Sequence, residues 1–262
     1  MKILVLIKQV PDTTDVKIDP ETNTLKREGV ESVINPFDMY AIEEAIRIKE
    51  RLGEGEVVAI SMGPPQAEEA LREAISMGCD SAILLSDRKF AGSDTWATSY
   101  SLSQAARKIG DYLVILCGKQ ASDGDTAQVG PGVSTHLEIP QVTYIKKIEE
   151  MDKEKARVER MTEEGFDIIE TPLPAVFTVV KEINEPRLPS LKGKMKAKKI
   201  EIPVWTAEDL ACNEEKIGLD GSPTRVVKIF TPPPREGGRV LEGEPDEISK
   251  ELTGLLKDVI TG

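Results

Sequence analysis

Histidine, cysteine and aromatic residues are scarce in this chain of 262 residues. The single histidine, His136, leaves little room for histidine-based catalysis or for a histidine-ligated metal. The cysteines, Cys79, Cys117 and Cys212, form no CxxC pair, which argues against a disulfide framework or a thiolate metal site and fits a reducing cytoplasm. Aromatic residues make up 4% of the chain, so few side chains could stack on nucleic-acid bases.

Long apolar runs and a surplus of positive charge are also missing. The longest apolar runs have about seven residues, far fewer than the roughly 20 that span a bilayer. The first run, residues 3–7, meets a charge at Lys8, which is untypical of a signal peptide and typical of a buried strand. The net charge of −12 argues against general nucleic-acid binding. We therefore expect a cytoplasmic protein with neither a membrane nor a nucleic-acid partner.

The common phosphate-binding motifs are absent as well. The chain contains no GxGxxG and no GxxxxGK[ST] sequence, so a bound nucleotide would require a different loop. No constellation of serine, cysteine and histidine suggests a nucleophile. Two alternatives are weakened by these absences but stay open: a nucleotide-dependent hydrolase or ligase, and an adenine-nucleotide sensor without enzymatic activity.

What the chain does contain is a regular alternation of short apolar runs and helical patterns over its first 150 residues. Residues 12–27 are expected to form a long loop or small hairpin. The alternation is typical of an α/β fold with a doubly wound, mostly parallel sheet of Rossmann type, for which we expect the strand order 3-2-1-4-5. Strands are expected at residues 2–10, 56–62, 81–86, 112–117 and 141–148, and helices at 38–52, 66–77, 93–109 and 126–137.

Helix ends are marked by capping residues. Gly53 and Gly78 are expected to end the first two helices, and Ser93 or Asp94 to begin the third.

The most distinctive stretch is GKQASDGDTAQVGP at residues 118–131, between the fourth strand and the fourth helix. A strand, a glycine-containing loop and a helix N-terminus offer free N–H groups and a positive dipole end to a phosphate. In the expected order, strands one and four are neighbours whose crossovers leave in opposite directions, and ligands bind at such a switch point. Lys8 and Met62 would meet the stretch there, and the NPFD turn at residues 35–38 would close the pocket.

Two acidic residues within this stretch are unfavourable neighbours for a phosphate. Asp123 and Asp125 would cap the helix, accept hydrogen bonds from ribose hydroxyls or face water. Gly124 between them would allow a positive φ or the close approach of a ligand.

The pattern changes after residue 150. Residues 157–161 and 166–170 are expected to form an antiparallel hairpin, and residues 175–180 a buried strand that extends the same sheet. We divide the chain into an α/β domain, residues 1–200, and a C-terminal part, residues 201–262. This part is expected to be a proline-broken, extended arm followed by an amphipathic helix at 246–260, packed on its own domain or on a partner subunit.

A basic segment, residues 181–199, differs in charge from the rest of the chain. It holds six lysines and one arginine against two glutamates, a net charge of +5. Leu188, Leu191 and Met195 lie among these charges. The segment is either a solvated basic stretch or a docking element in which charges steer a partner and an apolar side chain enters its pocket.

A series of short motifs runs through the chain in a specific order: VLIKQVPD at residues 5–12, NPFD at 35–38, GKQA at 118–121, DTAQVG at 125–130, TPLPAV at 171–176, NEPR at 184–187 and MKAKK at 195–199. With these motifs the chain resembles the beta subunit of electron transfer flavoproteins along nearly its whole length. The resemblance implies a heterodimer with an alpha subunit that carries a redox FAD.

The resemblance also implies a set of nucleotide-contacting residues, and they fall in the segments that meet at the switch point. Lys8 is added to this set because of its expected position at the switch point, and the resemblance does not imply it. The basic segment, with residues 184–199 as its recognition loop, would dock a partner dehydrogenase, with Leu191 as the anchor and Leu188 and Met195 beside it. The complete nucleotide set is Leu6, Lys8, Asn35, Pro36, Phe37, Asp38, Met62, Lys119, Gln120, Ala121, Ser122, Asp123, Gly124, Asp125, Thr126, Ala127, Gln128, Val129 and Gly130.

The resemblance leaves a choice of ligand: AMP in standard members of the family and a second FAD in electron-bifurcating members. The sequences at 123–131 and 140–144 look like the bifurcating branch, and small residues around Gly124 and Gly130 leave room for a flavin. We expect FAD, with AMP as the alternative.

In the bifurcating branch, the resemblance implies that NADH delivers a hydride to the beta-subunit flavin. One electron passes to a low-potential acceptor such as ferredoxin. The other passes through the alpha-subunit FAD to a flavin dehydrogenase of acyl-CoA or 2-hydroxy-acid type. We expect no catalytic acid–base side chain and no metal, because the flavins carry the chemistry.

Overall fold

The computed structural model describes residues 1–12, 32–227, 237–238 and 240–260, with side chains to residue 257. The loop or hairpin expected at residues 12–27 lies, from residue 13 on, outside these ranges. The chain divides into two compact units, Met1–Val227 and Lys228–Gly262.

The first unit is built on a nine-stranded sheet with the order β11-β5-β4-β1-β6-β10-β7-β8-β9. The expected α/β class with a mostly parallel sheet is confirmed, and so are the added antiparallel strands β8 and β9. The strands are β1 Lys2–Leu6, β4 Glu56–Met62, β5 Ser81–Leu85, β6 Tyr112–Gly118, β7 Gln141–Met151, β8 Lys155–Met161, β9 Phe166–Pro172, β10 Ala175–Val179 and β11 Val204–Trp205.

One strand interrupts the expected order. The five strands of the first 150 residues keep the sequence three, two, one, four, five, but β10 lies between the fourth, β6, and the fifth, β7, and runs parallel to both. In the chain, the antiparallel strands β8 and β9 come between β7 and β10, and β10 then pairs with β6 on one side and with β7 on the other. The entire strand is buried, which explains its uninterrupted apolar sequence.

The first expected strand is in fact two. The second piece, β2 Gln9–Pro11, pairs with β3 Ser32–Ile34 in a separate antiparallel ladder. The break falls at Lys8, whose N–H donates to the Asp38 carboxylate at 2.8 Å instead of to a neighbouring strand. The switch from one sheet to the other therefore takes place at the edge where the ligand site is expected.

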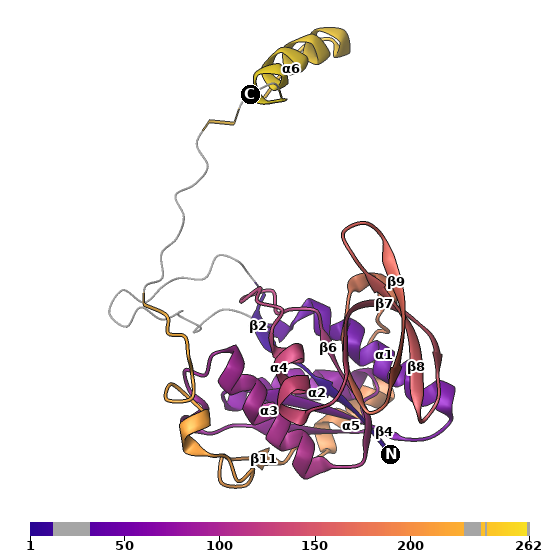
Figure 1. The fold of residues 1–262 in the computed structure, drawn as a ribbon, viewed down its shortest axis with the longest axis vertical. Helices are drawn as coiled ribbons and strands as arrows, with labels where there is room; N and C mark the ends of the chain where they lie inside the picture. The colour runs from indigo at the N-terminus through magenta and orange to yellow at the C-terminus, as the bar shows by residue number, and fades with distance from the viewer. Residues whose placement is uncertain (13–31, 228–236, 239, 261–262) are drawn as a thin grey trace. The chain divides into compact units, whose positions relative to one another are not determined.

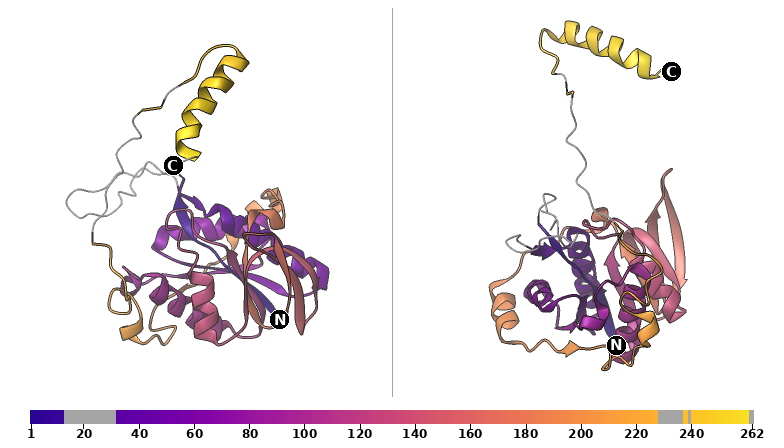
Figure 2. Two further views of the ribbon diagram at one scale, coloured as in Figure 1. Left: turned by 45° about the horizontal axis from the view of Figure 1, so that its top comes forward. Right: turned by 90° about the vertical axis from the view of Figure 1, so that its left-hand side faces the viewer.

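Helices cover both faces of the sheet (Figure 1, Figure 2). Alternate residues of β1 explain this: Ile3 and Val5 belong to the core beneath α1 and α2, while Leu4 and Leu6 belong to the core beneath α3 and α4. The described helices of this unit are α1 Pro36–Leu52, α2 Glu68–Met77, α3 Thr95–Ile109, α4 Val129–Leu137 and α5 Leu191–Lys199, with short 3-10 turns at Pro65–Ala67, Arg88–Phe90, Lys181–Ile183 and Glu214–Lys216.

The caps of the first three helices are the residues that the sequence predicted. Gly53 ends α1 in the left-handed conformation, with φ of 73°, and Gly78 ends α2. Asp94 begins α3, where its carboxylate accepts hydrogen bonds from the N–H groups of Trp96 and Ala97 at 2.9 and 3.1 Å.

The fourth helix does not begin near Thr126 as expected. Asp125 and Ala127 have φ values of 56° and 54°, which a right-handed helix cannot contain, and α4 begins only at Val129.

The C-terminal part begins inside the first compact unit. Residues of the expected extended arm form β11, which pairs parallel with β5, and the unit continues to Val227. The boundary that the sequence suggested at residue 200 thus falls within this unit. In the second unit, α6 Pro245–Ile260 occupies the position of the expected amphipathic helix. Among the described residues, no helix combines the length and apolar character that crossing a membrane requires.

Candidate functional site

A cleft of about 1200 Å³ opens beyond the carboxyl ends of β1, β4 and β6. The last residues of these strands, Leu6, Met62 and Gly118, line it. In this sheet β1 lies between β4 and β6, so the cleft sits at the topological switch point of the fold. Its apolar lining includes the side chains of Leu6, Met62, Phe90, Leu102, Cys117 and Val129.

Most of the residues that the sequence predicted for nucleotide binding line this cleft. They are Leu6, Lys8, Asn35, Asp38, Met62, Lys119, Gln120, Ala121, Asp123, Gly124, Thr126, Ala127, Gln128, Val129 and Gly130. Pro36, Phe37, Ser122 and Asp125 do not line it. Pro36 is the first residue of α1, and the ring of Phe37 lies 5.0 Å from the ammonium of Lys119. Ser122 and Asp125 form hydrogen bonds within the loop and its supports instead.

The start of α1 holds the cleft loop, which we define as residues 118–130. The buried Asp38 carboxylate accepts hydrogen bonds from the N–H of Lys8 at 2.8 Å and from the N–H of Gly118 at 3.0 Å, so it joins the ends of β1 and β6. Asn35 donates to the carbonyl of Gln120 at 2.9 Å and accepts from the N–H of Ser122 at 3.0 Å. These two side chains therefore act as supports of the loop.

The buried position of Asp38 shifts the pKa of its carboxyl group. Burial raises the pKa of this carboxyl to about 7, and the hydrogen bonds from the Lys8 backbone, the Asn35 side chain and the Gly118 backbone counteract only part of that increase. Asp38 is 5% exposed. Its protonation state thus changes near neutral pH, at the point where loop, strand and helix meet.

Close packing explains why the loop begins with glycine. A Cβ atom on Gly118 would come within 2.6 Å of both the Asp38 carboxylate and the Cβ of Phe37. Only the absence of a side chain allows β6 to pass so close to α1.

The middle of the loop differs from the expectation. Gly124 does not adopt a positive φ and has open space around it, whereas Asp125 and Ala127 are left-handed. Non-glycine residues in this conformation are strained and gather at functional sites. Neither Asp123 nor Asp125 caps α4, because the helix starts later: Asp123 forms an ion pair with Lys8 at 2.6 Å, and Asp125 accepts a hydrogen bond from Gln120.

The run of residues 126–130 combines a position at the cleft with backbone N–H groups that are unbonded among the described residues. All five residues line the cleft, and within the described part of the chain none of their N–H groups has a hydrogen-bond acceptor. Val129 and Gly130 are the first two residues of α4, so the positive end of its dipole lies here. Consecutive free N–H groups at a helix N-terminus are what a phosphate requires.

Sequence reasoning missed the wall of the cleft that follows β5. This wall comes from the connection between β5 and α3 and from the first part of α3. It meets the cleft loop where the hydroxyl of Thr95 donates to the Gln128 side chain at 2.8 Å. The sequence did contain a signal for this wall, because the third expected strand must end at the same edge of the sheet as strands one, two and four. The wall consists of Ser86, Asp87, Arg88, Phe90, Ala91, Gly92, Ser93, Asp94, Thr95, Thr98 and Leu102.

Two cations line the cleft without a carboxylate partner among the described residues. Lys119 lies beside the rings of Phe37 and Tyr144, and Arg88 is an exposed residue of the missed wall. Lys8, by contrast, is neutralised by Asp123. The unpaired cations, together with the free N–H groups, favour an anionic ligand.

A second region is exposed rather than concave. We call residues 184–199 the docking segment; it contains α5. Leu188, Leu191 and Met195 are 87%, 78% and 55% exposed, the large apolar side chains that the sequence predicted for partner contact. Ser190 caps α5 by accepting from the N–H of Gly193 at 2.9 Å, and α5 packs on α2.

The fold and the cleft define a class: a doubly wound α/β protein with a polar backbone cradle at its switch point. Comparison with known proteins then identifies the family. The family described as "Electron transfer flavoprotein domain" matches residues 22–210. The chain therefore belongs to the electron transfer flavoprotein family.

Full-length relatives agree on the kind of subunit. The electron transfer flavoprotein subunit beta of Thermoanaerobacterium thermosaccharolyticum is 53% identical over 257 residues, covering 98% of both chains. The subunit beta of Megasphaera elsdenii is 50% identical and covers 99% of this chain and 98% of its own. Subunit CarD of the caffeyl-CoA reductase-Etf complex of Acetobacterium woodii is 48% identical, again over 98% of both chains. The resemblance to beta subunits that the motifs indicated is confirmed.

Proposed function

We propose that this beta subunit binds FAD in the cleft and serves an electron-bifurcating electron transfer flavoprotein. The observation that carries the proposal is the row of free backbone N–H groups at residues 126–130 on one wall of a cleft that is otherwise largely apolar. A dinucleotide needs both surfaces: donors for its two phosphates and apolar walls for its rings.

Each part of the cleft then has a role in holding the cofactor. The N–H groups of Thr126 to Gly130 bind the pyrophosphate, with Lys119 or Arg88 adding charge. Leu6, Met62 and Leu102 contact the rings. Asn35 and Asp38 keep the cleft loop in place from behind. A bound FAD would supply the redox chemistry, with NADH as the hydride donor and with a low-potential acceptor such as ferredoxin and the alpha-subunit FAD as the electron acceptors.

The partners follow from the family and the relatives. A beta subunit acts with an alpha subunit, and the Acetobacterium woodii relative belongs to a complex with a caffeyl-CoA reductase. We propose a flavin dehydrogenase that acts on CoA esters as the terminal partner, contacted through Leu188, Leu191 and Met195 of the docking segment. Exposed apolar side chains among lysines suit a partner with an acidic surface and an apolar pocket.

A count of bound nucleotides tests the cofactor. The beta subunit is co-expressed with its alpha subunit, and the purified heterodimer is denatured and its nucleotides are separated by chromatography. We expect two FAD per heterodimer and no AMP. One FAD and one AMP would overturn the bifurcating proposal in favour of a standard electron transfer flavoprotein.

The pure beta subunit provides a further check on the ATP-hydrolase alternative. We expect no phosphate release from ATP, because the cleft brings together no nucleophile and base among its described residues. Release at a steady rate that depends on the cleft residues would contradict the proposal.

A further inference from the structure

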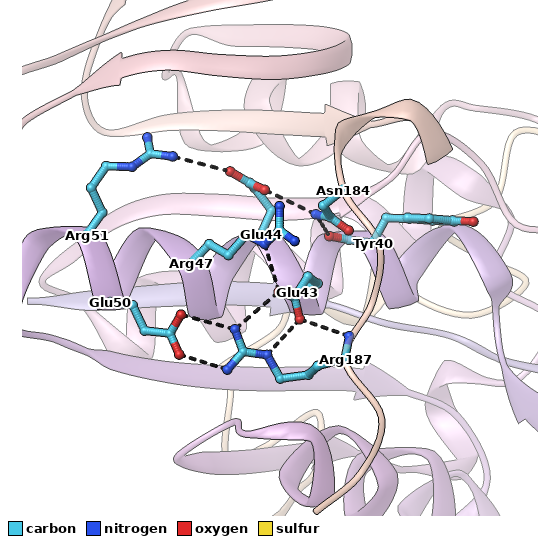
Figure 3. Close-up of polar contacts among 8 residues, drawn as sticks. All are labelled: Tyr40, Glu43, Glu44, Arg47, Glu50, Arg51, Asn184 and Arg187. Carbon is cyan, nitrogen blue, oxygen red and sulfur yellow. Dashed lines mark hydrogen bonds and ion pairs between the residues drawn. The ribbon is translucent and has the colours of Figure 1, made fainter.

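The first residues of the docking segment, 184–187, are held on α1 by a cluster of charged and polar side chains (Figure 3). The guanidinium of Arg187 donates to Glu43 at 2.7 and 3.1 Å and to Glu50 at 2.7 and 3.1 Å. The backbone N–H of Arg187 also donates to Glu43, at 3.1 Å. Glu43 and Glu50 are seven residues apart, about two turns of helix, so they lie on one face of α1.

A second contact lies beside the first. The side-chain amide of Asn184 donates to the Tyr40 carbonyl at 3.0 Å and to the Glu44 carboxylate at 3.1 Å. The two contacts hold the NEPR motif of residues 184–187 along α1, as Figure 3 shows. We call Arg187, Glu43 and Glu50 the arginine clamp.

The arginine clamp uses a geometry that lysine cannot reproduce. The planar guanidinium engages both carboxylates in a two-pronged fashion, whereas an ammonium is a single point of charge. Glu43 is buried, and hydrogen bonds from Arg187 and Arg47 outweigh the effect of its burial, so that its pKa is lowered. Hydrogen bonds from Arg187 lower the pKa of Glu50 as well, and the two carboxylates raise that of Arg187.

The residues that follow the clamp are the exposed ones. Leu188 comes directly after Arg187, and Leu191 begins α5. At its other end α5 is held on α2 and the residues just after it: Arg72 of α2 donates to the Ala197 carbonyl, and Lys196 donates to the Cys79 carbonyl at 3.0 Å. The docking segment is therefore fixed at both ends while its apolar side chains stay free. A surface held in its binding conformation loses less entropy when a partner binds.

The same helix supports the cleft. Asp38, in the first turn of α1, holds Gly118 and Lys8, and Glu43 lies about one and a half turns further along. The cleft loop and the docking segment are thus attached to one element, although 54 residues separate Gly130 from Asn184.

We propose that the arginine clamp is a positioning device for partner binding, which sets Leu191 relative to the cleft through α1, the helix that supports both. This inference rests on the docking role given to the segment under the proposed function. Arg187 itself is the positioning residue: it acts through the placement of Leu191 and not by touching the partner's redox group. A purely structural role would lower stability but would not change partner affinity selectively.

The test compares electron transfer to a purified acyl-CoA dehydrogenase for the heterodimers carrying Arg187→Lys, Leu191→Ala and both changes. For Arg187→Lys we expect the KM for the dehydrogenase to rise about tenfold, with kcat within twofold and the nucleotide content unchanged. Because Arg187 acts through Leu191, the double variant should resemble Leu191→Ala alone. The control is Arg157→Lys, since Arg157 forms an ion pair with Glu149 at 2.8 Å on a different part of the molecule. It should leave KM unchanged.

The outcomes separate the clamp from the proposals on which it rests. An unchanged KM for Arg187→Lys beside a raised KM for Leu191→Ala overturns the clamp alone, as do effects that multiply in the double variant. An unchanged KM for Leu191→Ala overturns the docking role and the clamp with it. The nucleotide count, made on the same preparations, tests the cofactor independently. If Arg187→Lys does not fold, Glu50→Gln leaves Glu43 paired and should raise KM about threefold; hydrogen exchange of residues 184–195 should accelerate in either variant and not in Arg157→Lys.

Discussion

The cleft loop and the docking segment are supported by the same helix in opposite ways. The cleft loop is held by buried side chains at the start of α1 that bond its backbone, and its N–H groups at residues 126–130 have no acceptor among the described residues. The docking segment is held by an arginine that pairs with one buried and one exposed carboxylate, and it presents apolar side chains to the solvent. One surface is made of backbone and the other of side chains.

This difference predicts how each region responds to mutation. A site made of backbone tolerates changes of its outward-facing side chains but not of the glycine or the buried acid that shape it. A surface made of side chains keeps its fold when a side chain is truncated but loses its partner. The predictions below test this contrast, beginning with the largest expected effect.

Gly118→Val should disrupt the packing that shapes the cleft and reduce nucleotide binding. The new side chain would overlap the Asp38 carboxylate and Phe37, and such overpacking costs about 1–3 kcal/mol or more. We expect the nucleotide bound per heterodimer to fall at least tenfold and the melting temperature to drop. Gly124→Ala is the control, because nothing lies within 4 Å of its Cβ position, and it should retain its nucleotide. Full nucleotide content in Gly118→Val would show that the close approach at this point is not required.

The pH dependence of stability should reveal Asp38. With a folded pKa of about 7 against an ordinary value of 3.8, the folded chain holds the proton more tightly than the unfolded chain. The free energy of unfolding therefore declines as pH rises from about 4 to 7 and levels off above 7, by about 2 kcal/mol between pH 5 and pH 7. Asp38→Asn removes this titration, so its stability difference from the wild type should change over this window, as measured by urea unfolding. Parallel pH profiles of the two proteins would contradict a raised pKa.

Leu191→Ala should affect only the docking segment. An exposed anchor that enters a partner pocket contributes about 1–2 kcal/mol, which corresponds to a rise of about tenfold in the KM for the partner dehydrogenase. The nucleotide content should stay at the wild-type level. Ile168→Ala, a truncation of another exposed apolar residue on β9, is the control and should leave KM unchanged. A fall in nucleotide content would mean that the two regions are not separable.

Asp123→Asn should have the smallest effect. The Lys8–Asp123 pair is partly exposed, and such pairs contribute about 0.2–1 kcal/mol. We expect nucleotide affinity, measured by titration at 0.1 M salt, to change less than about fivefold. A loss of more than tenfold would instead place Asp123 on the ligand, for example as an acceptor for ribose hydroxyls.

Much of the fold follows from local sequence patterns. The apolar runs that became β1, β4, β5 and β6 are recognisable because a strand covered on both faces must be apolar throughout. The caps at Gly53 and Asp94 are equally local. The insertion of β10 between β6 and β7 was not predictable, because an apolar run carries no information about which strands will flank it.

The candidate site likewise has features that the sequence predicted and features that it did not. Residues near the cleft could be selected because the carboxyl ends of parallel strands share one edge of the sheet. The functions of Asn35 and Asp38 as supports could not, since they depend on contacts with residues more than 70 positions away. The late start of α4 was missed because Asp125 and Ala127 take the left-handed conformation, for which alanine has no local preference.

By itself, then, the sequence determined most strands and helices, the subunit family and the two regions that we expect to contact ligand and partner, since composition and spacing are properties of neighbouring residues. Only the tertiary structure decided that the N–H of Gly118 donates to the Asp38 carboxylate and that Arg187 donates to Glu43, which is 144 positions away along the chain. The physical reason is that a hydrogen bond or an ion pair depends on separation in space, and the folding of α1 against both regions creates that proximity.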